Sequence, residues 1–126
     1  MKHLLDVNLL IAGIVQTHSR HAQARDWLSG KRIVLCPMVE LGFLRISTNN
    51  KTAIGLTMDQ ARDVLKRFAS ERSADRIPDD LPALDSHARS SGQVTDHYLA
   101  NLAAKHGLKL ATFDGQLNHP FSELIS

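Results

Sequence analysis

Four widely spaced carboxylates are the residues of this sequence that most directly indicate chemistry: Asp6, Glu40, Asp96 and Asp114. If they gather in one place they repel one another, and the electrostatic cost is large without a divalent cation. Oxygen ligands without organised Cys or His favour Mg²⁺ or Mn²⁺ over Zn²⁺. Such an ion activates a water and stabilises charge on a phosphate. The chemistry these residues predict is therefore hydrolysis of a phosphodiester.

Each carboxylate also has a structural interpretation. Asp96 is placed to complement a helix dipole, Asp114 precedes a glycine in a common turn pair, and Asp6 is placed to cap a helix. Glu40 is the hardest to explain in this way. It stands within the apolar stretch 38–44, where a carboxylate needs a partner or a metal.

The elements that must position these residues follow from the alternation of short apolar runs with helical stretches. Strands are expected at 3–5, 33–36 and 108–113, and helices at 7–15, 19–29, 38–47 and 95–106, with a further helix opened by a capping box at 57–60. Ser19 is a candidate N-cap, and residues 73–94 show no clear pattern. Alternating strands and helices predict a parallel sheet covered on both faces. Ligands collect outside the carboxyl ends of such strands, so we expect the four carboxylates to converge at that edge.

Composition limits the class of protein. A chain of 126 residues and 13.9 kDa predicts a single domain over 1–126. The apolar share of 43% and charged share of 22% are ordinary for a globular protein. One Cys excludes an internal disulfide and, with no apolar run long enough for a membrane span, predicts a cytoplasmic protein. A net charge of +2 permits contact with a polyanion but falls short of a dedicated nucleic-acid coat.

Each of the four carboxylates lies in a short motif, and the motifs follow one another along the chain. They are Leu4-Leu5-Asp6-Val7-Asn8, Val39-Glu40-Leu41, Thr95-Asp96-His97-Tyr98 and Ala111-Thr112-Phe113-Asp114. Each is weak alone, but the ordered set resembles the PIN-domain ribonuclease family, and most closely the VapC-type toxins of bacterial toxin–antitoxin pairs. The motifs extend from residue 6 to residue 114, and the resemblance covers essentially the whole chain.

This resemblance implies a PIN-like α/β fold of three layers, α/β/α, with a small central parallel sheet. It implies RNA cleavage dependent on Mg²⁺, with Mn²⁺ as a substitute, a cognate antitoxin that inhibits it, and a homodimer. By the same resemblance the acidic quartet matches Asp6, Glu40, Asp96 and Asp114, which would hold the metal. Asn8 and Thr112 match supporting positions, although a local bond from side chain to backbone explains them equally well.

Two basic residues are candidates for substrate binding. Arg45 follows Glu40 by five residues and would meet a substrate phosphate or form a salt bridge, of which we favour the salt bridge. Lys51 lies in a loop where it would track the RNA backbone or remain solvated. The pair His18 and His21 has helical spacing but no third ligand nearby, so we do not expect zinc there.

Two other classes compete with a nuclease. A receiver-type signalling module needs adjacent acids after its first strand, but Asp6 is followed by Val7 and Asn8, so we reject it. A catalytically silent PIN-fold module, acting through an antitoxin or RNA, stays as the alternative. The intact acidic set argues against it.

Overall fold

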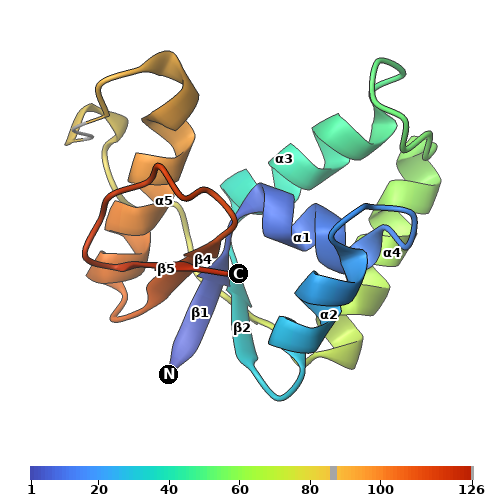
Figure 1. The fold of residues 1–126 in the computed structure, drawn as a ribbon, viewed down its shortest axis with the longest axis horizontal. Helices are drawn as coiled ribbons and strands as arrows, with labels where there is room; N and C mark the ends of the chain where they lie inside the picture. The colour runs from blue at the N-terminus through green and yellow to red at the C-terminus, as the bar shows by residue number, and fades with distance from the viewer. Residues whose placement is uncertain (86–87, 126) are drawn as a thin grey trace.

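A computed structural model describes residues 1–85 and 88–125, and Figure 1 shows their arrangement. The described residues form one five-stranded sheet with the order β3-β2-β1-β4-β5, in which every adjacent pair is parallel. The strands are β1 Lys2–Leu5, β2 Arg32–Leu35, β3 Asp75–Arg76, β4 Lys109–Thr112 and β5 Ser122–Leu124. The helices are α1 Val7–Ile14, α2 His21–Leu28, α3 Pro37–Thr48, α4 Met58–Glu71 and α5 Val94–Lys105, with short 3₁₀ turns at Ala83–Asp85 and Ser91–Gln93.

The register of the three central strands brings their carboxyl ends to one edge. Leu4 of β1 lies between Val34 of β2 and Leu110 of β4. Asp6, which follows β1, donates its backbone N–H to the carbonyl of Ala111 at 3.0 Å. The residues that follow β1, β2 and β4 therefore leave the sheet on the same side, as the sequence predicts.

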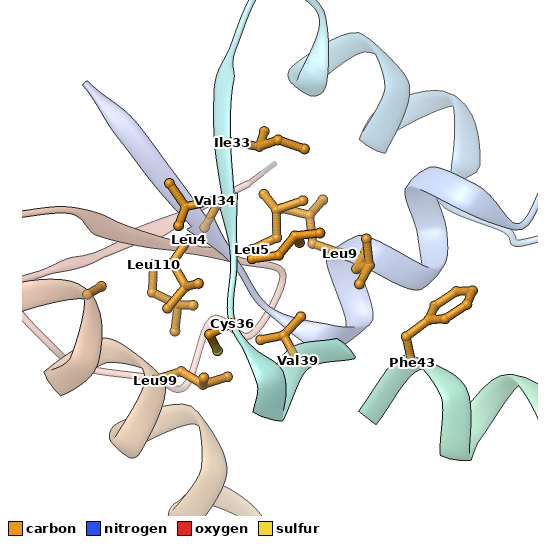
Figure 2. Close-up of a cluster of buried hydrophobic side chains, with 14 of the residues drawn as sticks. Leu4, Leu5, Leu9, Ile33, Val34, Cys36, Val39, Phe43, Leu99 and Leu110 are labelled. Atoms are coloured by element: carbon orange, nitrogen blue, oxygen red, sulfur yellow. The ribbon is translucent and has the colours of Figure 1, made fainter. Parts of the chain in front are cut away.

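Alternating side chains of the central strands build a core on both faces of the sheet. Leu5 and Ile33 point to the side of the sheet that carries α1 and α2, while Leu4, Val34 and Leu110 point to the side of α5 (Figure 2). All five are at most 2% exposed. Helices α1 to α4 lie on one side of the sheet and α5 on the other (Figure 1), so the predicted three-layer α/β/α fold is confirmed.

Local sequence explains where the main helices begin. Pro37 occupies the first turn of α3, where its missing N–H leaves no hydrogen bond unmade. Thr57 and Gln60 form the predicted capping box of α4, with bonds of 3.1 Å and 2.9 Å. Helix α2 begins at His21 with Arg20 as its N-cap, so the expected N-cap at Ser19 is wrong.

The two edge strands were not predicted from the sequence. β3 falls within 73–94 and has two exposed residues, and β5 has three residues of which none is buried. Neither carries an apolar run, because each lies at an edge of the sheet. No helix in the described ranges is long and apolar enough to cross a bilayer.

Candidate active site

Asp6 is a buried carboxylate held at the carboxyl end of β1. It follows β1 directly and occupies the N-cap position of α1, where its side chain makes no hydrogen bond of standard capping geometry. The residue is 3% exposed, and its Oδ2 accepts a hydrogen bond of 2.7 Å from the hydroxyl of Thr112. Burial raises the pKa of Asp6, while the Thr112 hydroxyl and the nearby amides of Val7 and Asn8 oppose that rise.

Thr112 joins two of the aspartates. Its Oγ1 donates to Asp6 and accepts from the backbone N–H of Asp114 at 3.0 Å. The Thr112 hydroxyl therefore makes both the local bond to the backbone and the contact with Asp6 that the sequence left as alternatives. The Asp114 side chain also forms the expected turn, accepting from the N–H of Gln116 at 2.9 Å.

Asp96 completes a group of three carboxylates. It lies in the first turn of α5 and is half-buried. Burial first, and then the negative charges of Asp6 and Asp114, raise the pKa of Asp96 to about 7. Asp96 also shares a hydrogen bond with Asp114, which the protonated acid alone can donate. The carboxylates are thus close enough for one of them to retain a proton near neutral pH.

A cavity of about 420 Å³ opens beside this group. Its lining consists of Asn8, His18, Arg20, Gly92, Asp96, Phe113 and Asp114. Asn8 is exposed there, and its supporting role stays a prediction. The guanidinium of Arg20 lies 4.0 Å from the centre of the Phe113 ring.

His18 and Arg20 were missed as neighbours of the acids. They belong to the connection between α1 and α2, and that connection returns to the carboxyl edge of the sheet. The sequence signal that could have indicated this was the polar stretch 16–20, which follows the apolar helix and so had to lie at the surface near the end of that helix.

Glu40 does not join the three aspartates in this structure. Its Oε2 accepts hydrogen bonds from Nε and Nη2 of Arg76 at 3.2 Å and 3.1 Å. It lines a separate cavity of about 350 Å³ between α3 and α4. The expected convergence of four carboxylates is therefore seen for three. The partner that Glu40 was expected to need in its apolar helix is Arg76 of β3.

The two candidate substrate-binding residues lie apart from the acidic cavity. Arg45 is exposed near the end of α3 and forms no ion pair with any residue the structure describes, so the favoured salt bridge is not observed. Lys51 is exposed in the following turn, where its N–H donates to the side chain of Asn49 at 2.9 Å. Their roles stay predictions.

The acidic group fits a hard cation in its chemistry. Within residues 1–85 and 88–125, no three Asp, Glu, His or Cys side chains are arranged as a complete set of metal ligands. Mg²⁺ does not require one, because it keeps several waters and binds through one or two carboxylates and substrate phosphates. Burial and then the charges of Asp6 and Asp114 raise the pKa of Asp96, and a bound cation would offset both because it stabilises the ionised carboxylate.

Comparison with known proteins identifies the family. Residues 3–120 match the PIN domain family model, so this chain belongs to the PIN domain family. Among curated proteins, the chain is 37% identical to Ribonuclease VapC38 of Mycobacterium tuberculosis over 88% of this chain and 84% of the relative. It is 36% identical to Ribonuclease VapC29 of the same species over 94% and 90%. The resemblance predicted from the motifs is confirmed.

Solved structures show the same fold. The VapBC2 structure from Rickettsia felis, bound to a DNA fragment from its promoter, superposes with a TM-score of 0.59 at 15% identity, covering 92% of this chain and 90% of that chain. The FitAcB structure from Neisseria gonorrhoeae gives a TM-score of 0.52 at 22% identity, covering 90% and 88%.

Proposed function

We propose that this protein is a metal-dependent endoribonuclease that acts as the toxin of a toxin–antitoxin pair. The observation that carries the proposal is the group formed by Asp6, Asp96 and Asp114, in which burial and mutual repulsion raise the pKa of Asp96 to about 7. The relatives named Ribonuclease VapC support RNA as the substrate. The VapC-type resemblance supports a cognate antitoxin and a cytoplasmic location.

The three aspartates would hold Mg²⁺, or Mn²⁺ in its place. When bound, the ion supplies an activated water and stabilises charge on the phosphate. Asp6 is already fixed by Thr112, so its carboxylate needs no reordering. Asp96 must give up the proton that it shares with Asp114, so metal affinity should increase as pH rises toward neutrality.

We keep Glu40 in the proposed acidic set, although in this structure its side chain is paired with Arg76 and not with the three aspartates. Its side chain is 22% exposed and that of its partner Arg76 is 57% exposed. An ion pair so exposed contributes at most about 1 kcal/mol. A cation or an RNA phosphate at the acidic edge would therefore compete with it at low cost.

Cleavage of a fluorogenic RNA tests the proposal. Asp6→Asn and Asp96→Asn should abolish cleavage that depends on Mg²⁺, because each removes a charged ligand and keeps the side-chain shape. Asp59→Asn is the matched control, since the Asp59 side chain is 93% exposed and, among the described residues, pairs only with Arg62 on α4. Full cleavage in either site variant would remove that residue from the mechanism. Absence of cleavage by the unmodified protein with any divalent metal would favour the silent binding module.

We also propose a homodimer, on the VapC-type resemblance. Sedimentation at micromolar concentration measures it directly, and a monomer there would contradict the proposal.

A further inference from the structure

Two adjoining cavities between α2 and α4 carry an excess of positive charge. The first, of about 330 Å³, is lined in part by His21, Arg25, Arg67 and Arg72, and the second, of about 620 Å³, again by His21, Arg25 and Arg72. The carboxyl-terminal ends of α2 and α4 lie close together (Figure 1). The Arg72 guanidinium, at the end of α4, donates a hydrogen bond of 3.2 Å to the carbonyl of Leu28, the last residue of α2.

The arginines of these cavities are not neutralised within the fold. Arg25, Arg67 and Arg72 form no ion pair with any residue in the part of the chain described, whereas Arg62 and Arg76 do. Burial and the nearby positive charge of Arg25 both lower the pKa of Arg72, against a smaller effect of Glu71. Asp26 and Glu71 are the acids in the linings, so three arginines face two carboxylates. Like charges held together in this way favour an external anion.

Helix α2 connects this basic surface to the acidic site. Arg20, its N-cap, lines the acidic cavity, and the next residue, His21, lines both basic cavities. His21 and Arg25 share a face because they are four residues apart. At 1.5 Å per residue, Arg20 and Arg25 are separated by roughly 7.5 Å along the helix axis. Because five residues also turn the helix by roughly 140°, Arg20 and Arg25 face different sides of α2. A strand that leaves the acidic site would therefore have to bend around the beginning of α2 to reach Arg25.

We propose that the surface formed by Arg25, Arg67 and Arg72 binds the backbone phosphates of the RNA strand that extends from the acidic site. The inference rests on the proposed function, because it assigns the anion to the substrate of that site. Guanidinium groups suit it, since their planar donors match phosphate oxygens in pairs. RNA is favoured over an acidic protein segment because α2 begins at the acidic cavity, which Arg20 lines, and lines the basic cavities from the next residue, His21, onward.

RNA binding without cleavage tests the inference. The probe is a labelled single-stranded RNA of about 12 nucleotides, within the footprint range of single-strand binding proteins, titrated in EDTA from about 50 to 200 mM salt. The test variant is Arg25→Gln with Arg67→Gln, two exposed residues that keep Arg72 and its bond to Leu28. The control is Arg32→Gln with Arg89→Gln, which changes net charge equally at other exposed positions. The test variant should lower affinity about tenfold and flatten the slope of log K against log salt by about 1.4, at 0.7 per phosphate.

Cleavage separates this inference from the proposed function. With Mg²⁺, the test variant should lower kcat/KM on the long RNA and leave a dinucleotide substrate unaffected, because the single phosphodiester of a dinucleotide occupies the acidic site itself. Unchanged salt slope and affinity in the test variant would overturn the inference, whether or not the protein cleaves RNA. A reduced slope in a protein that never cleaves would support this surface and refute the nuclease. Tighter binding of an acidic peptide than of the RNA at this surface would overturn the inference in favour of a protein partner.

Discussion

Removing the charge of Asp96 should stabilise the metal-free protein at alkaline pH. The pKa of Asp96 is about 7 in the folded chain against 3.8 in the unfolded chain, a difference of 7 − 3.8 = 3.2. The folded state therefore binds the proton more tightly, and the stability present below pH 4 is lost as pH rises through 7. At about 1.4 kcal/mol per unit the full shift would cost about 4 kcal/mol.

Solvent reduces that figure, because Asp96 is only half-buried. A cost of about 1–2 kcal/mol at pH 8 is the magnitude we expect after screening. Asn has nearly the same shape and can still donate to Asp114, so Asp96→Asn removes the charge and keeps the contact. The gain should be nearly absent at about pH 3, below the pKa of Asp96 in both the folded and the unfolded chain.

Urea denaturation in EDTA near pH 8, and again at about pH 3, measures this effect. At pH 8 the midpoint of Asp96→Asn should rise by about 0.5–1 M relative to the unmodified protein, and at about pH 3 the two should coincide. Asp59→Asn, at a fully solvated position, should change neither midpoint. Millimolar Mg²⁺ should raise the midpoint of the unmodified protein at pH 8 more than that of Asp96→Asn, because a ligand stabilises the state that binds it. A lower midpoint for Asp96→Asn at pH 8, or an equal gain at both pH values, would refute the reasoning.

Three further substitutions probe the framework of the site. Thr112→Val leaves the buried Asp6 carboxylate without its hydroxyl donor, so it should lower the free energy of unfolding by about 1–3 kcal/mol and reduce cleavage. Thr112→Ser keeps the hydroxyl and should retain both stability and cleavage. An equal loss in the Val and Ser variants would contradict the role of the hydroxyl. Gly42→Ala would place a Cβ 2.7 Å from Cγ2 of Val7, so thermal unfolding should show a loss of about 1–3 kcal/mol, and a neutral result would mean that α1 and α3 separate freely. Glu40→Gln should reduce kcat/KM less than Asp96→Asn does, and an equal loss would place Glu40 among the essential ligands.

The topology of the fold could be predicted because its central strands carry their own signal. Residues 33–36 and 108–113 are apolar runs bounded by charged or turn residues, and burial on both faces leaves little choice but a parallel strand. The edge strands could not be predicted in this way. Asp75 and Arg76 become a strand only through their register with Val34 and Leu35, which is a property of the neighbour rather than of the two residues.

The three aspartates could be predicted to meet because their positions depend on topology alone. Asp6 and Asp114 follow adjacent strands, and Asp96 begins the helix that leads into β4, so a parallel sheet places all three at one edge. Glu40 satisfies the same rule in sequence, yet its side chain turns to Arg76. That arginine lies within residues 73–94, where the sequence shows no clear pattern. The contact between Arg76 and Glu40 of α3 therefore could not be predicted from the sequence.

Thr112 explains how a site built from repelling acids persists before any cation arrives. One hydroxyl donates to Asp6 and accepts from the amide of Asp114, which fixes two carboxylates from neighbouring strands. Asp96 has no such donor among the described residues, so burial and the negative charges of Asp6 and Asp114 raise its pKa to about 7. A proton on Asp96, in contact with Asp114, then reduces the repulsion among the three carboxylates. On the proposed function, a divalent ion would compete with a proton for these carboxylates. Asp96 begins α5, which lies on the opposite side of the sheet from α1 to α4, so a cation could replace the proton on Asp96 without disturbing the bond between Thr112 and Asp6.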